Sequence, residues 1–219
     1  MFGVTPIGID QGLQRIVQTL AEVTPAEGVG SLEVKRFAVD IQGSRYDAAE
    51  LLRRFRARFK EVMAIKVGVE PAAPDVQLEP GEVLTMALPG RGHVQVRVEH
   101  VQEDQVIVGT LRGHAVAGIV RFSTRTLADG VRFEVMTCDR PANALDWIAL
   151  TLGGAQLQNA NWAAVVRNVS QLAGGTAGEV RRDQRKLSAD EAGAVEGWIE
   201  ALIRRQPDGP IDAPPPVLA

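Results

Sequence analysis

The sequence predicts an α+β fold in which a curved antiparallel β-meander packs on a long C-terminal helix. Three observations support this prediction. Five short segments between residues 82 and 136 alternate apolar and polar side chains, which is typical of half-buried strands. The turns between them are too short for parallel crossovers, so neighbouring strands are expected to run antiparallel. A helical pattern begins directly after Pro141 and continues to Leu172.

Two further helices and one strand are expected before the meander. Gln11–Val23 repeats apolar residues at helical spacing, which predicts an amphipathic helix. Ser31–Ile41 alternates as a strand does, and a break in its pattern suggests a β-bulge near Arg36. Tyr46–Met63 carries a strong apolar stripe and predicts the second helix.

The segment after Pro141 is expected to kink at Gly153-Gly154. After the kink its stripe is expected to continue through Leu157, Asn161, Ala164, Val165, Asn168 and Leu172. Arg181–Lys186 is interpreted as a basic connector. Ser188, with a glutamate three residues later, predicts the capping box of an additional last helix. These boundaries divide the chain into an N-terminal helix and loop (1–30), a core domain (31–175), a connector and helix (176–206) and a flexible proline-rich tail (207–219).

Composition excludes several classes of protein. The net charge of −3 argues against a nucleic-acid partner, and the arginines between residues 53 and 60 are interpreted as a solvated helix face. No apolar run reaches the roughly 20 residues of a membrane span. The first ten residues lack the basic and apolar regions of a signal peptide. The single cysteine, Cys138, fits a reducing compartment, so a cytoplasmic location is expected.

One part of the meander resembles a known family. The residues that carry the resemblance are Gly109-Thr110-Leu111-Arg112-Gly113-His114, Gly118, Arg121-Phe122, Val131-Arg132-Phe133-Glu134-Val135 and Asp139-Arg140-Pro141-Ala142. They are similar to an uncharacterised bacterial and plant family, catalogued as domain of unknown function nineteen-ninety. The similarity covers roughly Glu82 to Leu172. It implies relatives with no assigned activity, so no site residues carry over.

The order of elements resembles the helix-grip arrangement of START and Bet v 1-like proteins. In that arrangement the sheet wraps around the final helix and leaves an apolar cavity. The resemblance implies a pocket between the meander and the helix that follows Pro141. The helices outside the core pattern would be additions to it.

Four candidate site residues lie in or beside the meander. His114 stands in a Gly-His turn, where it could act as a general base, contact a ligand, or bond to nearby backbone. Asp139 could cap the following helix. Arg140 could pair with Glu134 or with a ligand carboxylate. Cys138 is interpreted as a small packed residue, because no neighbouring base would activate it.

Three further candidates lie on the long helix. Asn161 falls within the apolar stripe, and a buried amide must find a partner in the sheet, in another side chain or in a ligand. Trp147 and Trp162 flank the same helix and could form the wall of a pocket. Core packing is the simpler alternative for all three.

Three hypotheses follow for function. The first is a cavity that binds a small hydrophobic or amphipathic molecule. The second is an enzyme that uses His114, Asp139 and Arg140 in the same pocket. The third is a protein–protein interaction or homodimeric module, with its interface on the basic helix or on the last helix. No cofactor is expected. No metal is expected either, because His93 and His100 would point to opposite faces of a regular strand.

Overall fold

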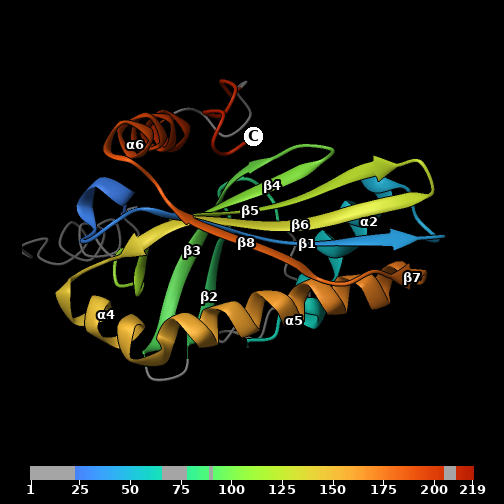
Figure 1. Ribbon diagram of the computed structural model, residues 1–219, viewed down its shortest axis with the longest axis horizontal. Coiled ribbons are helices and arrows are strands. Elements are labelled where there is room, and N and C mark those ends of the chain that lie inside the picture. Colours follow the sequence, from blue (N-terminus) through green and yellow to red (C-terminus); the bar gives the residue numbers. More distant parts are fainter. Residues whose placement is uncertain (1–22, 66–77, 89–90, 205–210) are drawn as a thin grey trace, which may run out of the picture.

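The computed structural model describes residues 23–65, 78–88, 91–204 and 211–219 (Figure 1). The helix expected over residues 11–23 lies outside the described residues, apart from Val23. The described strands are β1 (Glu33–Gln42), β2 (Val83–Leu88), β3 (Gly92–Val101), β4 (Gln105–Thr110), β5 (Val116–Leu127), β6 (Gly130–Pro141), β7 (Thr176–Ala177) and β8 (Arg181–Lys186). The described helices are the 3-10 turn η1 (Pro25–Glu27), α2 (Ala48–Ala57), α3 (Phe59–Val62), α4 (Ala144–Ala149), the π-helical turn η2 (Leu150–Gly154), α5 (Ala155–Ala173) and α6 (Ala189–Arg204).

The described strands form one antiparallel sheet in the order β2-β3-β4-β5-β6-β1, and both β7 and β8 pair with the free edge of β1. The five-strand meander and the α+β fold class are therefore confirmed. The prediction of a basic connector at residues 181–186 is wrong, because this segment is strand β8 and pairs with residues 33–38 of β1. All six of its side chains are exposed, so it has no apolar alternation to reveal it.

The predicted bulge near Arg36 is also wrong. Residues 33–42 of β1 pair one to one with residues 139–130 of β6, without interruption. The apolar pattern changes phase in this strand because its two ends are covered on opposite faces of the sheet. Val34 packs toward α6, whereas Phe37 packs toward α5. The bulge lies in β3 instead, between Val98 and His100, and the local twist that bulges add accompanies the turn of β2 and β3 away from the other strands (Figure 1).

The concave face of the sheet is covered by α2, α3 and α5, which together enclose the larger core. Phe55 of α2 stacks against Phe122 and Phe133, with ring centroids 4.9 and 5.1 Å apart. Trp162 of α5 meets Phe122 edge-on at 6.0 Å. The long helix α5 thus lies within the curve of the sheet, as the helix-grip prediction requires, and aromatic rings pack against it at Trp162.

The opposite face of the sheet is covered by α6, whose predicted capping box is confirmed. Ser188 Oγ accepts from the Glu191 N–H, and the Glu191 carboxylate accepts from the Ser188 N–H. Trp198 of α6 is buried, and its indole N–H donates to the carbonyl of Asp212 (3.0 Å). The part of the proline-rich tail at residues 211–219 packs against this face, where Leu218 is fully buried in the same core as Trp198.

The kink predicted in the long helix is confirmed at η2, where Gly153 has a φ of 134°. Only glycine adopts that conformation without strain. The predicted stripe is rotated by about one residue: Leu157 is 63% exposed, whereas Trp162, Val166 and Val169 face the core. Val165 belongs to both the predicted and the observed stripe. The expected apolar side of α4 and η2 likewise faces outward. The large apolar side chains exposed there are Leu145, Trp147, Ile148 and Leu152.

Candidate functional site

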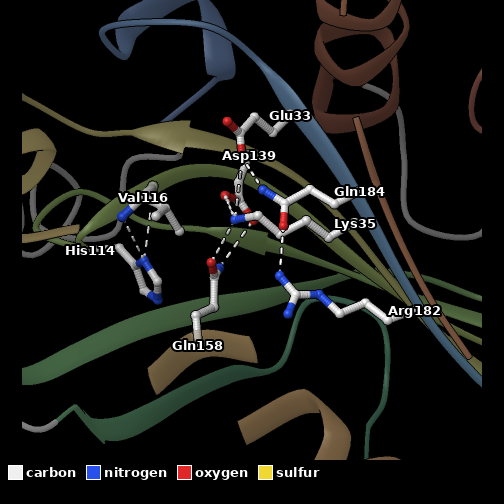
Figure 2. Close-up of polar contacts among 8 residues, drawn as sticks. All are labelled: Glu33, Lys35, His114, Val116, Asp139, Gln158, Arg182 and Gln184. Carbon is white, nitrogen blue, oxygen red and sulfur yellow. Dashed lines mark hydrogen bonds and ion pairs between the residues drawn. The ribbon is translucent and has the colours of Figure 1, made fainter. Parts of the chain in front are cut away.

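A buried polar cluster lies on the concave face, beneath the first turns of α5. Odd-numbered residues of β1 and β6 point toward α5, which places Lys35 and Asp139 side by side. Lys35 Nζ donates to Gln158 Oε1 (2.8 Å) and lies 3.7 Å from Asp139 Oδ1. Gln158 Nε2 donates to Asp139 Oδ2 (3.2 Å), so the three side chains close a ring of contacts (Figure 2).

Lys35 and Asp139 are each only 5% exposed. Removing two charges from water costs several kcal/mol per ion, and the mutual attraction offsets this only where further hydrogen bonds are present. Gln158 supplies such bonds to both partners.

A second chain of contacts extends the cluster to the sheet edge. Gln184 of β8 donates to Glu33 Oε2 (3.0 Å) and accepts from Arg182 (2.7 Å). Glu33 also lies 3.9 Å from Lys35 Nζ. The Arg182 guanidinium stands over the Phe37 ring, 5.8 Å from its centroid. Figure 2 shows Glu33, Gln184 and Arg182 beside Lys35 and Asp139.

His114 lies at the same end of the concave face. Its Nδ1 lies within hydrogen-bond distance of both the Val116 N–H (3.1 Å) and the Val116 carbonyl oxygen (3.2 Å), and the tautomer of the ring decides which of the two it bonds. Burial lowers the pKa of His114 to about 4, and the nearby charge of Asp139 opposes this only in part. The ring is therefore neutral near pH 7 and brings no charge to the cluster.

Three polar atoms around the cluster are buried and have no hydrogen-bond partner within the described part of the chain. They are Thr137 Oγ1, Asn161 Oδ1 and Trp162 Nε1. Thr137 lies opposite Lys35 in the sheet, and Trp162 follows Gln158 by one helical turn. A buried polar atom without a partner costs about 1–3 kcal/mol, so such atoms mark a place where water or a ligand completes the bonding.

The cluster is not sealed from solvent. Val120 lies opposite Thr137 in the middle of the sheet, yet it is partly exposed. His114, Gln158 and Asn161 are partly exposed as well. The concave face therefore remains partly accessible to solvent at these four side chains. Single π-helical turns such as η2 recur at functional sites.

The start of α4 is fixed by a side-chain cap. Asn143 accepts the Leu145 and Asp146 N–H groups, which fixes the start of the helix. Asp146 is buried, accepts from Asn143 Nδ2 (2.6 Å) and pairs with Arg91 (3.2 Å). The helix-capping role expected for Asp139 therefore belongs to Asn143.

The structure separates the seven predicted site residues into three groups. Those that share the concave face near the cluster are His114, Asp139, Asn161 and Trp162. Glu134 and Arg140 point to the opposite face, because neighbouring residues of a strand alternate sides. Trp147 is 50% exposed and lies outside the cluster.

The enzyme hypothesis based on His114, Asp139 and Arg140 is therefore wrong. The Arg140 guanidinium pairs with Glu196 of α6, on the far side of the sheet from His114. Glu134 pairs with Arg36 (2.9 Å), also on that side. The sequence could have predicted this orientation. Glu134 and Arg140 are separated by even intervals from Met136 and Cys138, which are apolar and pack against α6, so all four share one face of β6.

Sequence reasoning missed Lys35 and Gln158. The orientation of Lys35 could have been predicted, because Phe37, Val39 and Ile41 follow it at intervals of two residues and face the larger core. The bulge that was predicted near Arg36 interrupted this alternation, and Lys35 was therefore not assigned to the inner face. Gln158 was missed because the predicted stripe of α5 was rotated by one residue.

Other candidate regions have structural explanations. Burial raises the pKa of the Cys138 thiol, which keeps it protonated and unreactive. The arginines of α2 and α3 pair with acidic neighbours, as in Arg54–Glu50 (2.6 Å) and Arg56–Glu79 (2.7 Å). The positive charge of that helical segment is therefore largely balanced locally.

Two hollows, of about 300 and 570 Å³, lie elsewhere on the surface. The larger one is lined by charged groups of β1, β6 and β8, such as Arg36, Glu134 and Asp183. Neither is lined by Lys35 or Asp139. No helix among the described residues is long and apolar enough to cross a membrane.

Comparison with family models gives a clear assignment. A model described as Domain of unknown function (DUF1990) matches residues 19–168, which is more than half of the chain. The chain belongs to this family. The family resemblance carried by the meander motifs is confirmed. No curated protein matches the sequence.

Several solved structures resemble the chain at a distance. Norcoclaurine synthase from Thalictrum flavum shares 12% identity over 66% of this chain and 95% of its own, with a TM-score of 0.43. The protein Ms6760 from Mycobacterium smegmatis shares 10% identity over 65% of this chain and 91% of its own, with a TM-score of 0.43. DynU16, a protein of the dynemicin biosynthetic locus, shares 11% identity over 64% of this chain, with a TM-score of 0.42, and the chain spans about half of it (48%).

Proposed function

We propose that the protein binds a small amphipathic molecule beneath the start of α5, with the polar part of the ligand at the Lys35–Asp139 pair. The observation that supports this proposal is the set of unpartnered buried atoms around that pair, on Thr137, Asn161 and Trp162. Ligand sites combine apolar walls with a few converging polar groups, and this corner of the concave face has both.

The apolar part of the ligand would lie along Val120 and the Trp162 indole. These groups adjoin the polar cluster on the side toward the aromatic core. The rings of α2 and α3 fill the core beyond them, so the ligand is expected to be small and to occupy only the end of the concave face near η2.

Native mass spectrometry of gently purified protein tests the proposal. Gln158→Leu removes the group that bonds both Lys35 and Asp139, and Gln156→Leu makes the same chemical change on the exposed side of α5. We expect a copurified or added amphipathic molecule to remain bound in the wild type and in Q156L, and to be lost in Q158L. Equal retention by Q156L and Q158L would remove the cluster from consideration.

A second candidate function is self-association through the outward side of α4 and η2. The observation that favours it is the exposure of Leu145 (77%) and Leu152 (83%), since large apolar side chains grouped on a surface often mark interfaces. Light scattering on a sizing column would then give twice the monomer mass for the wild type and the monomer mass for Leu145→Lys. A monomeric wild type would rule this candidate out.

A further inference from the structure

The charges around the polar cluster balance one another. Lys35 lies between Asp139 (3.7 Å) and Glu33 (3.9 Å), and Glu33 is linked through Gln184 to the positive Arg182. Two positive and two negative groups therefore face this end of the concave surface from β1, β6 and β8.

The remaining charged groups nearby are balanced in the same way. From the side of α4, Asp146 is paired with Arg91 (3.2 Å). His114 is neutral near pH 7, because burial lowers its pKa to about 4. Among the described residues, the site thus offers no charge that lacks a partner of opposite sign.

The atoms that do lack partners are uncharged. The Trp162 indole N–H is a donor, the Asn161 amide oxygen is an acceptor, and the Thr137 hydroxyl is both. A ligand that brings one acceptor and one donor satisfies these atoms. A hydroxyl or an amide group does this without adding charge.

We infer that the ligand is an uncharged molecule, with a hydroxyl or amide group on an apolar body, and that carboxylates and amines of the same shape are rejected. This inference rests on the proposed function and specifies its ligand class. An ionised group in a largely buried site requires a counter-charge, and without one it pays a large desolvation cost. Lys35 and Asp139 each have a counter-charge already, so neither is available without breaking the pair.

Titration of the ¹⁵N-labelled protein with three naphthalene probes at pH 7 tests this inference. The probes are 2-naphthol, 2-naphthoate and 2-naphthylmethylammonium, which share one apolar body and differ in charge. The readout is the indole N–H resonance of Trp162, one of three tryptophans, assigned by its loss in Trp162→Phe. We expect 2-naphthol to shift this resonance with an affinity at least ten-fold higher than that of either charged probe.

The possible results separate the inference from the proposed function. Equal or tighter binding of 2-naphthoate or 2-naphthylmethylammonium at Trp162 would overturn the inference and leave the binding site in place. A Trp162 resonance that none of the three probes moves would contradict the proposed function itself.

A charge variant gives an independent test with the same probes. Asp139→Asn leaves Lys35 without its closest counter-charge, so 2-naphthoate should gain at least ten-fold in affinity relative to 2-naphthol. Glu196→Gln is the matched control, because Glu196 pairs with Arg140 on the opposite face. An unchanged preference in folded D139N would contradict the charge-balance argument, and the wild-type titration remains decisive if D139N does not fold.

Discussion

The half-buried His114 makes stability depend on pH in a defined window. His114 has a pKa of about 4 in the fold, against 6.5 for an unperturbed side chain, because burial disfavours the charged ring. Above pH 6.5 the ring is neutral in both states, so this contribution to stability is fully present. As pH falls from 6.5 to 4, the unfolded chain takes up a proton that the folded chain refuses, and stability is lost. The loss reaches about 3 kcal/mol by pH 4.

Urea unfolding at a series of pH values measures this loss. We expect His114→Gln to lose about 3 kcal/mol less unfolding free energy than the wild type between pH 7.5 and pH 4. Carboxylates titrate in both proteins and cancel in the comparison. Asp40, whose pKa the Arg132 side chain lowers to about 2 by hydrogen bonding, contributes its loss below pH 4, outside this window. His93→Gln changes an exposed histidine and serves as the control.

An NMR titration of the His114 ring gives the folded-state value directly. A midpoint close to 4 is expected. A midpoint near 6.5, or a stability profile of H114Q that runs parallel to that of the wild type, would refute the claim that His114 is held neutral at this site.

Three further predictions concern stability. Phe122→Ala should lower the free energy of unfolding by about 3–5 kcal/mol in chemical denaturation, because it leaves a cavity in the centre of the aromatic core. Leu145→Ala, on the exposed side of α4, should change it by no more than about 0.5 kcal/mol. Equal losses in the two variants would contradict the assigned faces. Lys35→Met should lower the free energy of unfolding by about 3–5 kcal/mol, because it leaves the buried Asp139 carboxylate without its counter-charge. Adding Asp139→Leu should restore much of this loss in the same assay. A double variant that is less stable than Lys35→Met would contradict this reasoning. Leu218→Ala should lower stability by about 2–5 kcal/mol, because Leu218 is fully buried in the core that it shares with α6. A neutral result would contradict that packing.

The sheet was largely predictable from the sequence, and the reason is physical. Each meander strand has one face that packs on the larger core, so apolar side chains recur at every second residue. This alternation is visible in the sequence and identifies the strands. β8 escaped prediction because it lies at the sheet edge with every side chain in water. It is held through backbone bonds to β1, which any sequence without proline can supply.

The site was predicted only in part, because its location depends on which face each residue occupies. Asp139 was found, but Arg140 was placed beside it although consecutive strand residues must diverge. Lys35 was missed because a bulge was assumed where the strand instead changes its covering helix from α6 to α5. That change is a tertiary property, so it becomes visible only when both helices are in place. Trp162 was named together with Trp147, but only Trp162 is buried on the inner face, so a tryptophan alone did not identify that face.

A high-resolution crystal structure of protein purified without denaturation tests the central claim most directly. The decisive feature is electron density between the Lys35–Asp139 pair and the Trp162 indole. Our account predicts an ordered small molecule there, with polar atoms within hydrogen-bond distance of Trp162 Nε1 and Asn161 Oδ1. A closed interior, in which these two atoms bond to neighbouring side chains and no space remains, would contradict it.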